Sequence, residues 1–282
     1  MKKKQTVLQC IILLLAIAIF FGYRIYVDMI TDSKAPEITV SEEQLVVSVA
    51  DPESALLQGV TAWDSRDGDV TESVIVERIY GLTDENIITV TYAAFDTSGN
   101  VSKATRQVCY ADYHAPVFSL SRSLAFSGSM DIMNFIGAED VFDGDIHRRI
   151  RSSIVSDNGS LSNTGKHEVE FQVYNSIGDT VKLVLPVEVY SADKYNAKLE
   201  LNQYLVYLNS GDKFNAESYL SSFSYYGNDI SLRRGVPSDV SVKINGSVDT
   251  REPGVYPVTY TATRIGGQLI YTGYTMLIVV VE

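Results

Sequence analysis

Cysteine is nearly absent from this chain, which has two in 282 residues. Cys10 lies in an apolar N-terminal run, and Cys109 is the single cysteine in the rest of the sequence. Because one thiol cannot form an intradomain disulfide, the folded units after residue 34 must be held together by packing. This excludes domains whose stability depends on a buried disulfide. We expect Cys109 to pack as a small apolar side chain.

Histidine and positive charge are also scarce. The three histidines, His114, His147 and His167, do not stand at metal-ligand spacing, and the sequence contains no hydrolase elbow or phosphate loop. We therefore predict that the protein is not an enzyme. Four of the 23 Lys+Arg and one of the 35 Asp+Glu lie in the first 30 residues. The rest of the chain therefore has 19 basic and 34 acidic residues. This acidic remainder disfavours nucleic acid as a partner.

The longest apolar run lies at the N-terminus, after three lysines at positions 2–4. Its length and flanking charges predict a cytoplasmic tail at 1–5, a transmembrane helix at 6–26 and the remaining chain outside the cell. A cleavable signal peptide is the alternative, since Ala16-Ile17-Ala18 has the small-residue spacing of a cleavage site. The continued apolar sequence at 19–21 favours the uncleaved anchor.

After residue 34, the sequence repeats at intervals of about 80 residues. Ala35-Pro36 recurs as Ala115-Pro116, and strands with alternating apolar residues recur at 88–94, 169–173 and 256–262. No stretch shows a sustained helical period. The repeats predict an all-β fold with three tandem modules at 35–110, 115–190 and 197–282. The linkers between them are short.

The first repeat carries the most distinctive motifs. Gly-Val-Thr-Ala-Trp-Asp-Ser-Arg-Asp-Gly-Asp-Val-Thr at 59–71, followed by Ile-Thr-Val-Thr-Tyr-Ala-Ala-Phe-Asp-Thr-Ser-Gly-Asn at 88–100, resembles the bacterial surface immunoglobulin-like domain. That family is also repeated in some pesticidal crystal proteins. The third repeat resembles it over 248–263, and the second keeps Asp-Gly-Asp at 143–145. The resemblance implies three tandem immunoglobulin-like β-sandwiches after the N-terminal helix, and it does not imply a ligand.

Two acidic loops of the first repeat form a candidate calcium site. Oxygen ligands are available from Asp64, Asp67 and Asp69, with Asp96 and Asn100 joining them if the loops meet. A hydrogen-bonded turn without metal is the alternative. The later repeats favour the turn, because Asp96 is replaced by Asn in the second and only one aspartate of the first loop remains in the third.

Tyrosine is concentrated near the C-terminus, where ten of the 18 lie after residue 194. Tyr225 and Tyr226 stand in a polar loop context and are candidate binding residues. Tyr256 and Tyr260 alternate with Val258 in a strand and are expected in the core. Ordinary packing remains the alternative for the two loop tyrosines.

These observations predict a non-enzymatic protein that is anchored in the cell membrane by a single span. Its N-terminus would be cytoplasmic, and its immunoglobulin-like modules would act outside a bacterial cell as a spacer or binding stalk for protein or glycan. The alternative is an accessory of cell-envelope assembly that partners a membrane enzyme or exporter. No cofactor other than calcium is expected.

Overall fold

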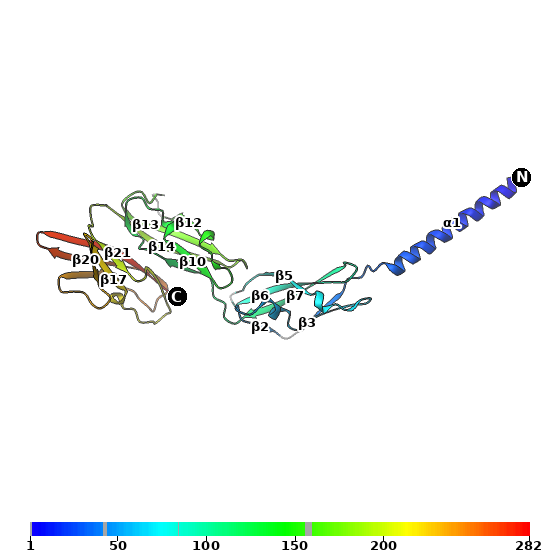
Figure 1. Cartoon of the computed structure of the whole chain (residues 1–282), viewed down its shortest axis with the longest axis horizontal. Coiled ribbons are helices and arrows are strands. Elements are labelled where there is room, and N and C mark those ends of the chain that lie inside the picture. Colours follow the sequence, from blue (N-terminus) through cyan, green and yellow to red (C-terminus); the bar gives the residue numbers. More distant parts are fainter. Residues whose placement is uncertain (1, 42–43, 84, 156–159) are drawn as a thin grey trace. The chain divides into compact units, whose positions relative to one another are not determined.

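A computed structural model describes residues 2–41, 44–83, 85–155 and 160–282. The chain divides into two compact units, Met1–Tyr113 and His114–Glu282. The first unit contains an N-terminal helix and one β module, and the second contains two β modules (Figure 1). Each unit is described by itself below.

The N-terminal helix, α1, runs over Lys2–Ile30 (Figure 1). Its sequence contains Gln5, Gln9 and Arg24 as well as the apolar run. Among the residues that the structure describes, no helix combines the length and apolarity needed to cross a membrane. The predicted transmembrane span over 6–26 is therefore not supported.

All three modules have the same sheet topology, in which a three-stranded sheet faces a four-stranded one. In the first module the sheets have the orders β1-β3-β4 and β2-β7-β6-β5. Their strands are β1 (Glu37–Val40), β2 (Leu45–Val47), β3 (Val60–Asp64), β4 (Gly68–Asp69), β5 (Ile75–Tyr80), β6 (Ile87–Phe95) and β7 (Val101–Tyr110), with short 3₁₀ turns η1 (Glu53–Leu57) and η2 (Thr71–Ser73).

The second module repeats this arrangement as β8-β10-β11 facing β9-β14-β13-β12, and the third as β15-β17-β18 facing β16-β21-β20-β19. The second consists of β8 (Val117–Leu120), β9 (Ala125–Ser127), η3 (Ile132–Asn134), β10 (Ile136–Asp140), β11 (Gly144–Asp145), η4 (His147–Arg149), β12 (Arg151–Ile154), β13 (Gly165–Tyr174) and β14 (Thr180–Tyr190). The third consists of β15 (Lys198–Leu201), β16 (Leu205–Leu208), η5 (Ala216–Tyr219), β17 (Leu220–Tyr225), β18 (Asn228–Ser231), β19 (Val240–Asn245), β20 (Gly254–Gly266) and β21 (Leu269–Val281). The prediction of three repeated β-sandwiches is confirmed.

The alternating residues of the long central strands form the cores. Ile88, Val90 and Tyr92 of β6 are fully buried, as their spacing predicts for a strand with one face turned inward. The Tyr92 hydroxyl donates to the Leu56 carbonyl oxygen at 2.8 Å, so the buried phenol keeps a hydrogen-bond partner. Tyr260 of β20 makes the equivalent bond in the third module.

The second and third modules share a core within their unit. In β21, Leu277, Val279 and Val281 face the third module, while Met276, Ile278 and Val280 join the cluster of buried residues of the second. A strand that is buried on both faces has apolar residues in succession along its sequence, which explains the sequence of β21. The short linker between these modules therefore leads into a packed joint.

Candidate functional site

The first acidic loop of the first module is organised around Asp64, at the end of β3. Its Oδ1 accepts hydrogen bonds from the backbone N–H groups of Arg66 (2.7 Å) and Asp67 (3.0 Å). These bonds hold the pKa of Asp64 below its ordinary value of 3.8. The loop turns at Gly68, whose φ of 79° is the left-handed conformation that glycine adopts without strain. Asp64 is therefore a charged carboxylate at neutral pH.

The other two aspartates of this loop are occupied by local bonds. The carboxylate of Asp67 accepts from the backbone N–H of Thr97 at 2.7 Å and from the hydroxyl of the same residue. Asp69 accepts from the backbone N–H of Thr71 at 2.9 Å. Asp67 thus connects the two loops of the module, and Asp69 stabilises the next turn.

The second loop presents Asp96, which is 8 % exposed. Its Oδ1 accepts from the backbone N–H of Asn100 at 2.8 Å, and its Oδ2 accepts from the Asn100 side-chain amide at 2.7 Å. Burial alone would raise the pKa of Asp96, but these hydrogen bonds outweigh burial and lower it. Asp96 is therefore a second carboxylate that is kept charged in a largely buried position.

A third carboxylate comes from Asp32, in the segment between α1 and β1. One ligand atom each from Asp32, Asp64 and Asp96 can be chosen so that all lie within 4.8 Å of one another. The side-chain amide of Asn100 donates to the Asp32 carbonyl oxygen at 3.2 Å, which ties this segment to the second loop. Three acidic side chains thus converge at one end of the first module.

Two oxygen atoms of this acidic cluster are buried without a hydrogen-bond partner among the described residues. They are Oδ2 of Asp64, a residue only 2 % exposed, and Oδ2 of Asp32. Desolvating a carboxylate oxygen without a partner costs free energy, so an arrangement of this kind requires an explanation.

The structure changes the membership of the predicted calcium site. Of the five predicted residues, Asp64 and Asp96 belong to the cluster, and Asn100 supports it through hydrogen bonds. Asp67 and Asp69 are not members. Asp32 was missed because it lies outside the repeated motif, where neither spacing nor periodicity marks it. Calcium binding itself stays a prediction.

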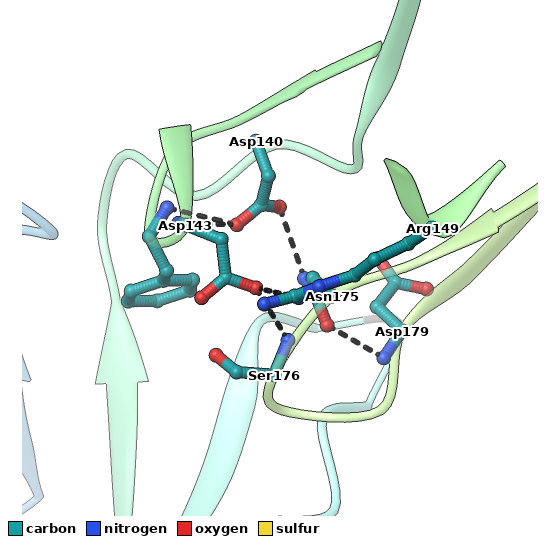
Figure 2. A network of polar contacts seen from close by, with 7 residues as sticks. Asp140, Asp143, Arg149, Asn175, Ser176 and Asp179 are labelled. Carbon is teal, nitrogen blue, oxygen red and sulfur yellow. Dashed lines mark hydrogen bonds and ion pairs between the residues drawn. The ribbon is translucent and has the colours of Figure 1, made fainter. Parts of the chain in front are cut away.

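The second module contains the same turn with a different set of partners (Figure 2). Asp140 Oδ1 accepts from the backbone N–H groups of Phe142 (2.9 Å) and Asp143 (3.0 Å), as Asp64 does in the first module. Here the facing loop supplies Asn175, whose side-chain amide donates to Asp140 Oδ2 at 3.0 Å. The oxygen that is left without a partner in the first module is therefore satisfied in the second.

The remaining contacts of this network follow the first module closely. Asp143 accepts from the backbone N–H of Ser176 at 2.6 Å, as Asp67 does from Thr97, and it also forms an ion pair with Arg149 (Figure 2). Burial raises the pKa of Asp143, but the bonds from Ser176 and Arg149 have the larger combined effect and lower it. Within the described part of the chain, no buried side-chain oxygen of this second network lacks a hydrogen-bond partner.

The two predicted tyrosines of the third module have different surroundings. Tyr226 lies in the left-handed conformation (φ 47°) in the tight turn between β17 and β18 and is 85 % exposed. Tyr225 packs against Tyr271, with ring centroids 4.6 Å apart, and against the guanidinium of Arg264. Tyr226 is thus available to a partner, while Tyr225 supports the hairpin. Their role in binding stays a prediction.

A cleft of about 800 Å³ lies between the second and third modules, within their common unit. Charged and polar side chains line it together with a group of packed tyrosines. Tyr195 stacks on Tyr274 at 4.9 Å between ring centroids, and Tyr190 meets both rings edge-on. The lining also includes Arg122, Lys198, Glu200, Asn202 and Arg233. No sequence pattern predicts this cleft, because it forms only where two modules pack against each other.

Comparisons with known proteins give similarity to solved structures alone. No family model matches the chain, and no curated protein matches it. The chain is similar to the extracellular domain of protocadherin GammaB4 (11 % identity, 89 % of this chain, 51 % of that chain, TM-score 0.20). It is also similar to Drosophila N-cadherin EC1-4 (14 %, 89 %, 76 %, 0.23) and to the CBM51-2 and INT domains of Clostridium perfringens ZmpB in complex with GlcNAc (15 %, 87 %, 44 %, 0.22).

The chain spans about half the length of the protocadherin structure. At TM-scores near 0.2, these similarities carry no argument about function. The function must be inferred from the sites of this chain.

Proposed function

We propose that this protein is a non-enzymatic binding protein whose β-sandwich modules act outside the cell, and that the cleft between the second and third modules binds a glycan. The cleft is the observation that carries this proposal. Its volume of about 800 Å³ lies within the range of ligand sites in proteins, about 300–1,000 Å³.

The joint between the modules supports a preformed cleft. Ile278 of the third module is fully buried in the core of the second, and two polar bonds cross the same joint. The Tyr274 hydroxyl donates to Glu188 at 2.7 Å, and the backbone N–H of Met276 donates to Ser123 Oγ at 2.9 Å. Walls fixed in this way reduce the ordering cost of binding.

The lining has the chemistry that sugars require. Hydroxyl-rich ligands need both donors and acceptors of hydrogen bonds. The cleft offers Arg233 as a donor, Glu200 as an acceptor and Asn202 as both. Arg233 is already oriented, since its Nε and Nη2 donate to Ser221 Oγ at 3.3 and 3.2 Å. Tyrosine rings add apolar area for the faces of the sugar rings.

The location outside the cell rests on the N-terminal sequence. Three lysines precede an apolar segment, which is the order of an export signal. Protease treatment of intact cells tests this location: the modules should be digested without lysis. Protection of the modules until the cells are lysed would contradict it.

Binding by the full chain to an array of oligosaccharides, followed by titration calorimetry with the best ligand, tests the cleft. We expect Arg233→Ala to weaken binding by at least about tenfold, because a charged donor that lines the cleft would be lost. Tyr226→Ala, at the exposed hairpin, is the matched control and should bind as the wild type does. Loss of binding in Tyr226→Ala alone would move the site to the hairpin, and the absence of any glycan ligand would contradict the proposal.

A further inference from the structure

We propose that Asp32, Asp64 and Asp96 form a calcium site that fastens the segment before β1 to the loops of the first module. This inference is independent of the glycan proposal, because it concerns the other compact unit. It rests on the convergence of three carboxylates and on two buried oxygens that no group of the described residues satisfies.

The charge of the cluster points to a cation. Three carboxylates whose ligand atoms lie within 4.8 Å of one another repel strongly in a largely buried site. Within the described part of the chain, none of the three forms an ion pair with Lys, Arg or His. The charge of Lys34 lowers the pKa of Asp64, but its effect is weaker than that of the backbone hydrogen bonds. A bound divalent ion would supply the missing positive charge.

The unpartnered oxygen of Asp64 shows where a ligand would be bound. This residue is 2 % exposed and its Oδ1 is fully engaged by the turn, so its side chain is fixed while Oδ2 remains free. Asp32 Oδ2 is likewise buried and free. Two preplaced oxygens from separate segments are what a metal site provides before the ion arrives.

The second module shows how the same turn is satisfied without an ion. There, Asn175 provides an N–H group for Asp140 Oδ2 at 3.0 Å, so that oxygen needs no other partner. In the first module the equivalent residue is Asp96, whose side chain has no N–H group to donate. Replacement of an amide by a carboxylate thus converts a closed hydrogen-bond network into a set of oxygen ligands.

The ligand chemistry selects calcium. All three side chains offer hard oxygen atoms, and the described cluster contains no nitrogen or sulfur ligand. Calcium accepts six to eight oxygen ligands in flexible geometry, so three carboxylates with added water fit its requirements. Asp32 gives the site a structural consequence, because it lies before the first strand and would be held against both loops.

The test uses calcium chloride as the probe and the full chain as the protein. Trp63, the single tryptophan, precedes Asp64 in β3, so its fluorescence reports on the first module separately from the others. Calcium should raise the fluorescence-detected melting temperature by at least about 4 °C relative to EDTA, as ligand linkage predicts for a small domain. Titration calorimetry should show one calcium site per chain.

Two variants and one control locate the site. Asp96→Asn copies the residue pair of the second module and should fold while losing the calcium shift; Asp32→Asn should lose it without altering either loop. Asp69→Asn removes the same charge from the same loop outside the cluster and should keep the shift. An unchanged wild-type melt, an equal effect of sodium chloride at matched ionic strength, or a full shift in Asp96→Asn or Asp32→Asn would overturn the proposal. Loss of the shift in Asp69→Asn would also overturn it, because the effect would then follow overall charge.

Discussion

The first and second modules share a turn but complete it in different ways. In both, an aspartate at the end of a strand accepts two backbone N–H groups, and a second acidic residue bonds to the facing loop. The difference lies in one side chain of that loop, Asp96 in the first module and Asn175 in the second. The second module closes its network with protein atoms, whereas the first leaves buried oxygens without partners. A change of one amide to one carboxylate therefore separates a structural turn from a candidate ion site.

The modules also differ in how they are supported. The described residues of the first compact unit form one β module, whereas the second module shares its core with the third. A substitution that destabilises the second module should therefore also destabilise the third.

The largest expected effect comes from the shared core. Ile278→Ala should destabilise the second and third modules together by about 2–5 kcal/mol, because it leaves a cavity in a fully buried joint. Differential scanning calorimetry should show one shifted transition, while the Trp63 signal of the first module stays unchanged. Ile88→Ala makes a matched cavity in the first module. It should shift the Trp63 signal and leave the transition of the second and third modules unchanged. Separate melting of the second and third modules would contradict the shared core.

The next effect tests the turn of the second module. Asp140→Ala removes the acceptor of two backbone N–H groups and of the Asn175 amide, and it should cost about 1–3 kcal/mol. Urea unfolding followed by circular dichroism measures the loss. Glu139→Ala, at the exposed neighbouring position, should change stability by less than about 0.5 kcal/mol. Equal effects of the two variants would show that the network adds little.

A smaller effect is expected when the second module is given the residue of the first. Asn175→Asp replaces a hydrogen-bond donor with a second carboxylate beside Asp140, and it should destabilise the module by about 1 kcal/mol at pH 7. The loss should shrink as the pH falls toward 4, because a protonated carboxyl donates again. A pH series of melting temperatures measures this change, and a loss independent of pH would argue for a purely steric cause.

The smallest effect concerns the ion pair of the second module. Hydrogen bonds and Arg149 lower the pKa of Asp143, so its contribution to stability is present above the ordinary value of 3.8 and is lost as the pH falls through its lower folded value. The first module has Ser73 at the position equivalent to Arg149. Arg149→Ser should therefore cost less than about 1 kcal/mol at neutral pH, and its difference in stability from the wild type should disappear as the pH falls through the folded pKa of Asp143. A difference in stability that is the same at neutral and at acidic pH would contradict this role.

The strands were predictable from the sequence because local patterns determine them. The alternation of Ile88, Val90 and Tyr92 marks a half-buried strand, and the repeat period fixes the number of modules. The apolar run of β21 was recognisable as a strand, but its burial on both faces was not, since that depends on the neighbouring module. The cleft was unpredictable for the same reason.

The candidate ion site was predictable only in part. The turn residues Asp64 and Asp96 belong to a repeated motif, and their types and spacing predict them as candidate ligands. Asp32 lies in a segment without a repeat, and only the folded chain brings it to the loops. The substitution of Asp96 by Asn175 suggested a motif that decays along the chain. In the structure the side-chain amide of Asn175 instead donates a hydrogen bond to Asp140, so the asparagine stabilises the turn.

The parallel pairing at the edge of each larger sheet has a mechanical consequence. In all three modules a short early strand runs parallel to the last strand: β2 to β7, β9 to β14 and β16 to β21. Tension applied through the ends of a module pulls these paired strands in opposite directions along their length. Their backbone hydrogen bonds are then loaded together in shear and must break almost at once, rather than one after another as when a hairpin is peeled apart. Each module is thereby built to resist pulling.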